Sequence, residues 1–155
     1  MDTLYTQTNI KQIISVDFND IENDMYHYFM NYAKVNIEGR CRKEGYIRQK
    51  STRIDNYTAP ILKGSLCIYE VNYVSDVCDP LIDNVYQCKI LKLAKIGIRA
   101  VISYTNNPII FYISREHNPL VNFDNYKEGD IINAKIIGKR FQLNDFNIEA
   151  IAEVV

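Results

Sequence analysis

Five short segments rich in β-branched residues follow one another in the second half of the chain, and this pattern constrains the fold most strongly. Each segment has the length and composition of a strand, and glycine, asparagine or proline separates it from the next. Five such strands fit a small closed barrel. The predicted strands are residues 85–93, 97–104, 109–114, 131–140 and 147–155, with turns at Asn106-Asn107-Pro108 and Glu128-Gly129-Asp130.

The first half of the chain combines strands with one helix. Residues 10–18 alternate as a strand does. Apolar residues then recur at three- and four-residue steps, which is typical of a helix packed on a sheet, and Asp17 or Asn19-Asp20 is expected to cap that helix. The stripe consists of Ile21, Met25, Tyr28, Phe29 and Tyr32. Strands are predicted to begin at 35–39 and continue at 45–47, and a hairpin of 54–62 and 66–77 turns at Lys63-Gly64.

Pro80 is the predicted joint between the two halves. The residue before a proline is pushed out of helical geometry, and Asp79 and Asp83 keep the segment in water. The chain is therefore predicted to have two domains, 1–80 and 81–155, of the α+β class: a small β-sheet with one helix, followed by a five-stranded barrel. At 155 residues the chain is long enough to bury a core without disulfides or metals.

Several function classes are disfavoured by composition. No apolar run is long enough to cross a bilayer, and the N-terminus lacks the features of a signal peptide, so an intracellular protein is expected. The cysteines lack the spacing of zinc ligands and are predicted to be reduced, buried thiols. His27 and His117 have no patterned nucleophile or acid beside them, so no catalytic residue, metal or cofactor is predicted. The cysteines are Cys41, Cys67, Cys78 and Cys88.

Charge is distributed unevenly despite a net charge of −1. Between residues 84 and 115 there is no acid, and five cations stand unopposed: Lys89, Lys92, Lys95, Arg99 and Arg115. Cations on a barrel face would neutralise the phosphates of a single strand and make binding depend on salt. The absence of acids favours RNA binding here, and the alternative is an ordinary solvated surface.

A second basic cluster lies in the first half and contains Arg40, Arg42, Lys43, Arg48, Lys50 and Arg53. Gly39 and Gly45 in the same segment are expected to adopt positive φ or to approach neighbouring backbone closely, which would make the loop rigid. The alternative interpretation is again a solvated turn.

The order of two motifs resembles a known family. The segment 38–47, with Glu38-Gly39-Arg40-Cys41 and then Gly45-Tyr46-Ile47, followed by Asn72-Tyr73-Val74 and Pro80, is similar to the tip domain of the seventh, or stalk, subunit of multisubunit DNA-directed RNA polymerases. The segment 88–102, with Gly97 between two strands, resembles the OB fold of the ribosomal S-one type. In length and residue usage the chain is most similar to versions from nucleocytoplasmic large DNA viruses.

This resemblance implies a non-catalytic stalk subunit. The first half would dock on the polymerase clamp, formed by the large subunits, and the barrel would contact nascent single-stranded RNA. A fourth-subunit-like partner is possible in this family, and the location would be the virion and host cytoplasm for a viral protein or the nucleus otherwise. The docking residues implied are Gly39, Arg40, Arg42, Lys43, Gly45 and Tyr46.

The same resemblance indicates Tyr112 as an RNA-binding residue. It lies in Phe111-Tyr112-Ile113-Ser114, where many S-one domains have a histidine, and its ring is expected to stack on a base. Arg99 and Ile96 occupy positions where the family often has further aromatic residues. Two alternatives remain: a free-standing RNA-binding protein of the S-one type, and a structural virion component whose barrel binds no RNA.

Overall fold

The computed structural model describes residues 4–105 and 107–155 and divides the chain into two compact units, one ending at Asp79 and the other beginning at Pro80. The described residues are rich in strands and contain a single α-helix. No helix among them is long and apolar enough to span a bilayer. The extreme N-terminus at Met1–Thr3 and position Asn106 of the predicted turn lie outside the described residues.

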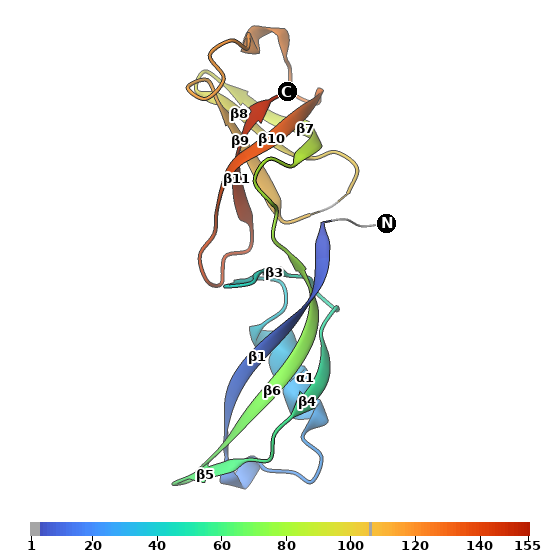
Figure 1. Ribbon diagram of the computed structural model, residues 1–155, viewed down its shortest axis with the longest axis vertical. Coiled ribbons are helices and arrows are strands. Elements are labelled where there is room, and N and C mark those ends of the chain that lie inside the picture. The colour runs from blue at the N-terminus through green and yellow to red at the C-terminus, as the bar shows by residue number, and fades with distance from the viewer. Residues whose placement is uncertain (1–3, 106) are drawn as a thin grey trace. The chain divides into compact units, whose positions relative to one another are not determined.

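The N-terminal unit is built on two long antiparallel strands. β1 (Tyr5–Asp17) pairs along its whole length with β6 (Leu66–Cys78). The other edge of β6 is shared in succession by β5 (Ile61–Lys63), β4 (Arg53–Tyr57) and β3 (Gly45–Ile47), and β3 also pairs with β2 (Cys41–Arg42). β6 is therefore the central strand of a six-stranded sheet, as Figure 1 shows.

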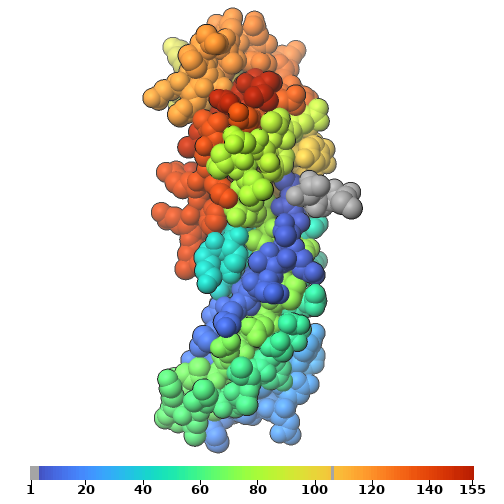
Figure 2. All heavy atoms as spheres, viewed as in Figure 1, coloured from blue at the N-terminus to red at the C-terminus, as the bar shows by residue number. Residues whose placement is uncertain are grey.

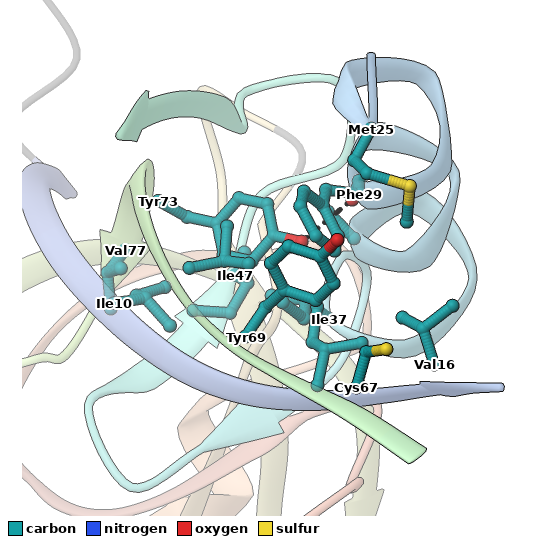
Figure 3. Packing of buried hydrophobic residues seen from close by; sticks show 13 residues of the cluster. Ile10, Val16, Met25, Phe29, Ile37, Ile47, Cys67, Tyr69, Tyr73 and Val77 are labelled. Carbon is teal, nitrogen blue, oxygen red and sulfur yellow. Dashed lines mark hydrogen bonds between the residues drawn. The ribbon is translucent and has the colours of Figure 1, made fainter. Parts of the chain in front are cut away.

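Helix α1 (Tyr26–Asn36) covers one face of this sheet. Alternate residues of β1 and β6 point toward it and are buried, because a strand turns successive side chains to opposite faces. Figure 3 shows Phe29 of the helix among the rings of Tyr69 and Tyr73, whose hydroxyl donates to the carbonyl of Phe29 at 2.7 Å. Burial raises the pKa of Tyr73, so the hydroxyl stays protonated as this hydrogen bond requires.

The predicted helix exists, but its details differ. The buried stripe is Met25, Phe29, Ala33 and Ile37, whereas Tyr28 is exposed. Asp17 accepts from the N–H of Asn19 and caps the short 3-10 turn η1 (Phe18–Asp20), while Asp24 accepts from the N–H of Tyr26 at the helix start.

The strand predicted at 35–39 was wrong. These residues include the last turn of α1, because burial of Ile37 extends the apolar stripe and outweighs the β preference of Val35. The N–H groups of Ile37 and Glu38 both donate to Ala33, and Gly39 ends the turn with φ of 75°. The strand predicted at 54–62 is also divided into β4 and β5, with Pro60, which has no N–H, in the break.

The C-terminal unit is a closed barrel of five strands, which confirms the predicted architecture. The strands are β7 (Val85–Ala94), β8 (Gly97–Ile102), β9 (Ile109–Ser114), β10 (Ile131–Arg140) and β11 (Ile148–Val154). β7, β8 and β9 form an antiparallel meander, β11 joins β9 in parallel, and β10 closes the barrel between β11 and β7. The connectivity is OB-like.

The barrel interior alternates small and large side chains. Ala100, Ala134 and Ala150 are buried beside Phe111 and Ile136, so that strands approach closely around one aromatic ring. The segment between β9 and β10, in orange at one end of the barrel in Figures 1 and 2, contains η2 (Phe123–Asn125). Within it the buried Asn118 accepts from Val154 at 2.8 Å and donates to Ser114 at 2.8 Å, which ties the segment to β9 and β11.

Candidate nucleic-acid interface

A row of outward side chains crosses the first three barrel strands. Lys92 on β7 lies opposite Arg99 on β8, and Arg99 lies opposite Tyr112 on β9. Residues directly opposite in a sheet share a face, so the three side chains are neighbours. All three are exposed, Tyr112 to 40%. The structure therefore brings together three of the six residues predicted to bind RNA.

A β-bulge at Leu91 explains why Lys89 also points outward. Lys89 and Lys92 are three residues apart and would face opposite sides of a regular strand. The register between β7 and β8 shifts between Ile90 and Lys92, so Leu91 is the extra residue. Lys89 lies opposite Val101, on the far side of the bulge from the row, and Lys95 lies in the turn between β7 and β8.

A groove runs beside this row. The floor of this groove is a second row of small residues, Ala94, Gly97 and Ser114, which lies beside the first row on the same three strands. Together with Ile96, Lys92, Arg99 and Tyr112, they line a hollow of about 280 Å³. Glycine is required in the floor, because a Cβ at Gly97 would overlap the backbone carbonyl oxygen of Ile113. Ile96 is 83% exposed and leaves an apolar edge on the turn.

In the described part of the chain, four cations of the barrel have no carboxylate close enough to neutralise their charge. Among the described residues, no carboxylate forms an ion pair with Lys89, Lys92, Lys95 or Arg99. Arg115 differs from them, because its guanidinium lies 3.9 Å from Asp124 and stacks over Phe123 at 5.0 Å from the ring centroid. Arg115 thus belongs to the segment between β9 and β10, and part of its charge is already balanced.

Tyr112 also borders a second hollow, of about 330 Å³, on the side of β11. Its other lining residues are Ile151, Arg140 and Glu149. Ile151 lies opposite Tyr112 in the parallel pairing, and Arg140 contacts Glu149 through Nε at 3.1 Å and Nη2 at 2.6 Å. The sequence did not reveal these residues, because only the pairing of β9 with β11 brings them to Tyr112.

The loop between β10 and β11 adds two exposed apolar side chains that the sequence analysis missed. Leu143 is 68% exposed and Phe146 is 70% exposed. Both lie among polar residues, Gln142, Asn144 and Asp145, in the stretch between the last two predicted strands. An aromatic residue in a polar loop was the available signal, since such a ring is seldom needed for the fold.

The six predicted docking residues of the N-terminal unit are mostly engaged within that unit. Arg40 donates to the carbonyl of Val35 at 2.9 Å, and Arg42 donates to the side chain of Gln12 on β1 at 2.7 Å. The side chain of Arg42 is only 19% exposed, whereas Lys43, in the turn between β2 and β3, is exposed. This loop therefore offers one outward charge rather than three.

The remaining three docking residues form the framework of this loop. Gly45 has φ of 133°, and a Cβ there would overlap the backbone carbonyl oxygen of Cys78. Tyr46 is paired with both Cys41 and Cys78, and burial raises its pKa. Gly39 lies against the side chain of Gln49 with φ of 75°. Both glycines have positive φ, as expected, and the backbone at Gly45 is packed against the end of β6.

The described residues hold no group of three His, Cys, Asp or Glu side chains that could bind a metal ion. All four cysteines are buried, and burial raises the pKa of Cys88 to about 12, so its thiol is not ionised near neutral pH. His27 and His117 are both exposed. The outer face of the barrel combines exposed cations, the exposed ring of Tyr112 and a groove.

In comparisons with known proteins, neither a protein-family model nor a curated protein sequence matched the chain.

Proposed function

We propose that this chain is a non-catalytic protein that binds single-stranded RNA on the outer face of its barrel, as the stalk subunit of a DNA-directed RNA polymerase. One observation carries the RNA-binding part. Lys92 and Arg99 have no ion-pair partner among the described residues, and their row ends at the exposed ring of Tyr112 beside a groove.

The chemistry of this row suits an extended single strand. Lys92 and Arg99 would neutralise successive phosphates, and each contact contributes about −0.7 to the slope of log affinity against log salt. A base placed against Tyr112 would gain about 1–3 kcal/mol from stacking. A duplex keeps its bases stacked inside, so it would offer phosphates to the row but no free base to the ring.

The strand order supports the assignment to an OB fold, of which the proposed S-one type is one form. A meander of three strands, a fifth strand parallel to the third and a fourth that closes on the first is the connectivity expected of such a barrel. In this fold the second and third strands and the loops beside them hold single strands. Arg99 and Tyr112 lie on those strands, and Phe146 lies in the loop between the fourth and the fifth.

The order of the two units supports the stalk assignment. A sheet with one helix precedes the barrel, as the resemblance to the tip domain implies. The proposed partners are the large polymerase subunits at the clamp, a fourth-subunit-like protein and nascent RNA. If docking uses the loop around Gly39 and Tyr46, Lys43 supplies its exposed charge, because Arg40 and Arg42 are engaged within the unit.

RNA binding is tested by titrating a fluorescent single-stranded RNA with the wild-type chain and with the double variant Lys92→Ala, Arg99→Ala, at several salt concentrations. Loss of two phosphate contacts predicts about 10- to 30-fold weaker binding at 0.1 M salt and a slope that is flatter by about 1.4. Tyr112→Leu should weaken binding without changing the slope, since it removes the ring and no charge.

The matched control removes two exposed cations from the N-terminal unit, Lys34→Ala and Lys50→Ala, neither of which forms an ion pair among the described residues. This variant should bind RNA like the wild type. Equal losses in both double variants would mean that binding follows net charge alone, and unchanged affinity after loss of Lys92 and Arg99 would remove the proposed RNA site.

Assembly is tested separately by purifying the tagged chain from its native source at moderate salt and identifying its companions by mass spectrometry. Equimolar recovery of the two largest polymerase subunits is the expected result. Recovery of an RNA-binding chain alone would favour the free-standing alternative. A chain that copurifies with capsid proteins and binds no RNA would favour the virion component.

A further inference from the structure

The second hollow beside Tyr112 continues the row that begins at Lys92 and Arg99. Ile151 on β11 lies opposite Tyr112 on β9, and Gly138 on β10 lies opposite Ile151, so the row of outward positions extends across two further strands. These three strands are neighbours in the barrel, as Figure 1 shows. A single strand of RNA that follows the row from Lys92 therefore reaches this hollow directly after Tyr112.

One wall of the hollow is a pair of charged side chains. Glu149 lies two residues before Ile151 and shares its outward face of β11, and Arg140 lies opposite Glu149 on β10. The guanidinium donates from Nε at 3.1 Å and from Nη2 at 2.6 Å to the same carboxylate oxygen, Oε2. No described residue donates a hydrogen bond to the other oxygen, Oε1. Arg140 thus holds the carboxylate in place and leaves one of its oxygens available to a ligand.

Stability of the fold does not account for this pair. The side chain of Arg140 is 77% exposed and that of Glu149 is 42% exposed, and ion pairs in such surroundings stabilise a protein little or not at all. Among the described residues that line the two hollows beside Tyr112, Glu149 is the only acid. A carboxylate repels phosphates, so a surface that only neutralised the RNA backbone would gain nothing from an acid at this position.

A carboxylate beside a stacking ring distinguishes the four bases by their hydrogen-bond donors. Guanine carries N1–H and N2–H next to each other on its Watson–Crick edge, and a carboxylate accepts from both. Uracil has one N–H between two carbonyl oxygens, which a carboxylate repels. Adenine and cytosine each present one amino group beside a ring nitrogen that is itself an acceptor. Guanine is therefore the base that this wall fits best.

We propose that the hollow is a base pocket selective for guanine. The base stacks on Tyr112 and covers the apolar side chain of Ile151, while Glu149 accepts from N1–H and N2–H. Arg140 is a positioning residue, because it acts on the base through the carboxylate that it holds. The pocket rests on the proposed RNA-binding function and adds a preference for one base to a row that otherwise contacts phosphates.

Selectivity is tested by titrating the full chain with fluorescent RNA octamers that consist of uridine except at one central position. Guanine at that position should bind about 5- to 20-fold more tightly than uracil, adenine or cytosine at 0.1 M salt. This is the lower part of the range for a bidentate contact, because the hollow is open to water. Inosine, which lacks the N2 amino group, should lose most of the advantage. The 7-deaza analogue of guanosine, which keeps both donors, should retain it.

The variants are compared by the ratio of guanine to uracil affinity, which a partly inactive preparation does not change. Glu149→Gln should lower this ratio below about twofold, because the amide loses the charge and replaces one acceptor with a donor. Arg140→Ala should also lower the ratio, and Arg140→Lys should restore part of it. The matched control is Glu153→Gln, which removes an acid from the same face of β11 that pairs with Lys135 at 3.3 Å and does not line the hollow. It should keep the wild-type ratio.

The outcomes separate this pocket from the RNA-binding function on which it rests. Equal binding of all octamers by the wild type, with a salt slope that flattens in Lys92→Ala, Arg99→Ala, would overturn the guanine pocket and leave the RNA site intact. Absence of binding to every octamer would overturn both. A guanine preference that survives Glu149→Gln, that Glu153→Gln abolishes as well, or that the 7-deaza analogue loses would also overturn the assignment to this carboxylate.

Discussion

The two basic clusters of this chain look alike in the sequence and differ in the structure. On the barrel, Lys92 and Arg99 lie opposite each other on paired strands, point outward and form no ion pair among the described residues. In the N-terminal unit, Arg40 donates a hydrogen bond to the carbonyl of Val35, and Arg42 donates one to the side chain of Gln12. The difference teaches that a cluster of cations indicates a binding surface only where the fold leaves their charges unused.

Glycine in the N-terminal loop provides the largest expected effect. Gly45→Ala should destabilise the chain by about 3 kcal/mol or more, because positive φ adds strain to the overlap with the Cys78 carbonyl. Gly64→Ala is the control, since it also has positive φ but open space around it, and should cost about 1–2 kcal/mol. Chemical denaturation measures both. Equal costs would mean that the backbone around Gly45 shifts to accept a Cβ, so that the close approach to Cys78 is not a constraint on this position.

The contrast between arginines gives the next effect. Arg42→Ala should lower the free energy of unfolding by about 1.5 kcal/mol, because it removes a charged hydrogen bond to Gln12. Arg99→Ala should change it by less than about 0.5 kcal/mol, as expected for a surface residue without partners. Thermal and urea unfolding of the two variants would decide. A stability loss at Arg99 similar to that at Arg42 would erase the distinction between the clusters.

Arg115 sharpens the comparison within the barrel itself. Arg99→Ala should weaken RNA binding about fivefold at 0.1 M salt, the effect of one phosphate contact. Arg115→Ala should have less than half that effect, because Asp124 and Phe123 already engage its guanidinium. The two single variants are compared in the same titration. A larger loss at Arg115 would move the RNA path toward the segment between β9 and β10.

The smallest expected effect concerns the cysteines: a thiol-reactive dye should not label the native chain at pH 8. The three cysteines of the N-terminal unit and Cys88 of the barrel are all buried. Because the pKa of Cys88 is raised from 9.0 to about 12, its contribution to stability is complete below pH 9 and is lost as the pH rises toward 12. Labelling with a thiol-reactive dye should require denaturant. Rapid labelling at pH 8 would show that one unit opens readily.

Much of the fold follows from local patterns. The barrel strands were predicted to within two residues at each end, because β-branched runs and turn residues such as Gly97 and Gly129 mark them directly. Helix α1 was recognised from its stripe, but its end was not. Burial of Ile37 decides that end, and burial depends on the sheet beneath the helix.

The candidate site was predicted less completely, for physical reasons that individual residues illustrate. The bulge at Leu91 aligns Lys92 with Arg99, and nothing in the local sequence marks it. Ile151 reaches Tyr112 through a parallel pairing between distant strands. Arg42 is drawn inward by Gln12, thirty residues earlier in the chain. Contacts across such separations depend on the assembled fold, which a reading of residue types does not supply.

The most direct test asks which of the two basic clusters holds RNA. A single-stranded RNA containing 4-thiouridine is cross-linked to the full chain by ultraviolet light, and the modified peptides are identified by mass spectrometry. The account predicts cross-links on the barrel, within Ile109–Ser114 around Tyr112 and on the turn at Ile96, that disappear in the double variant Lys92→Ala, Arg99→Ala. Cross-links concentrated at Arg40 to Arg53, or spread evenly over both units, would contradict it.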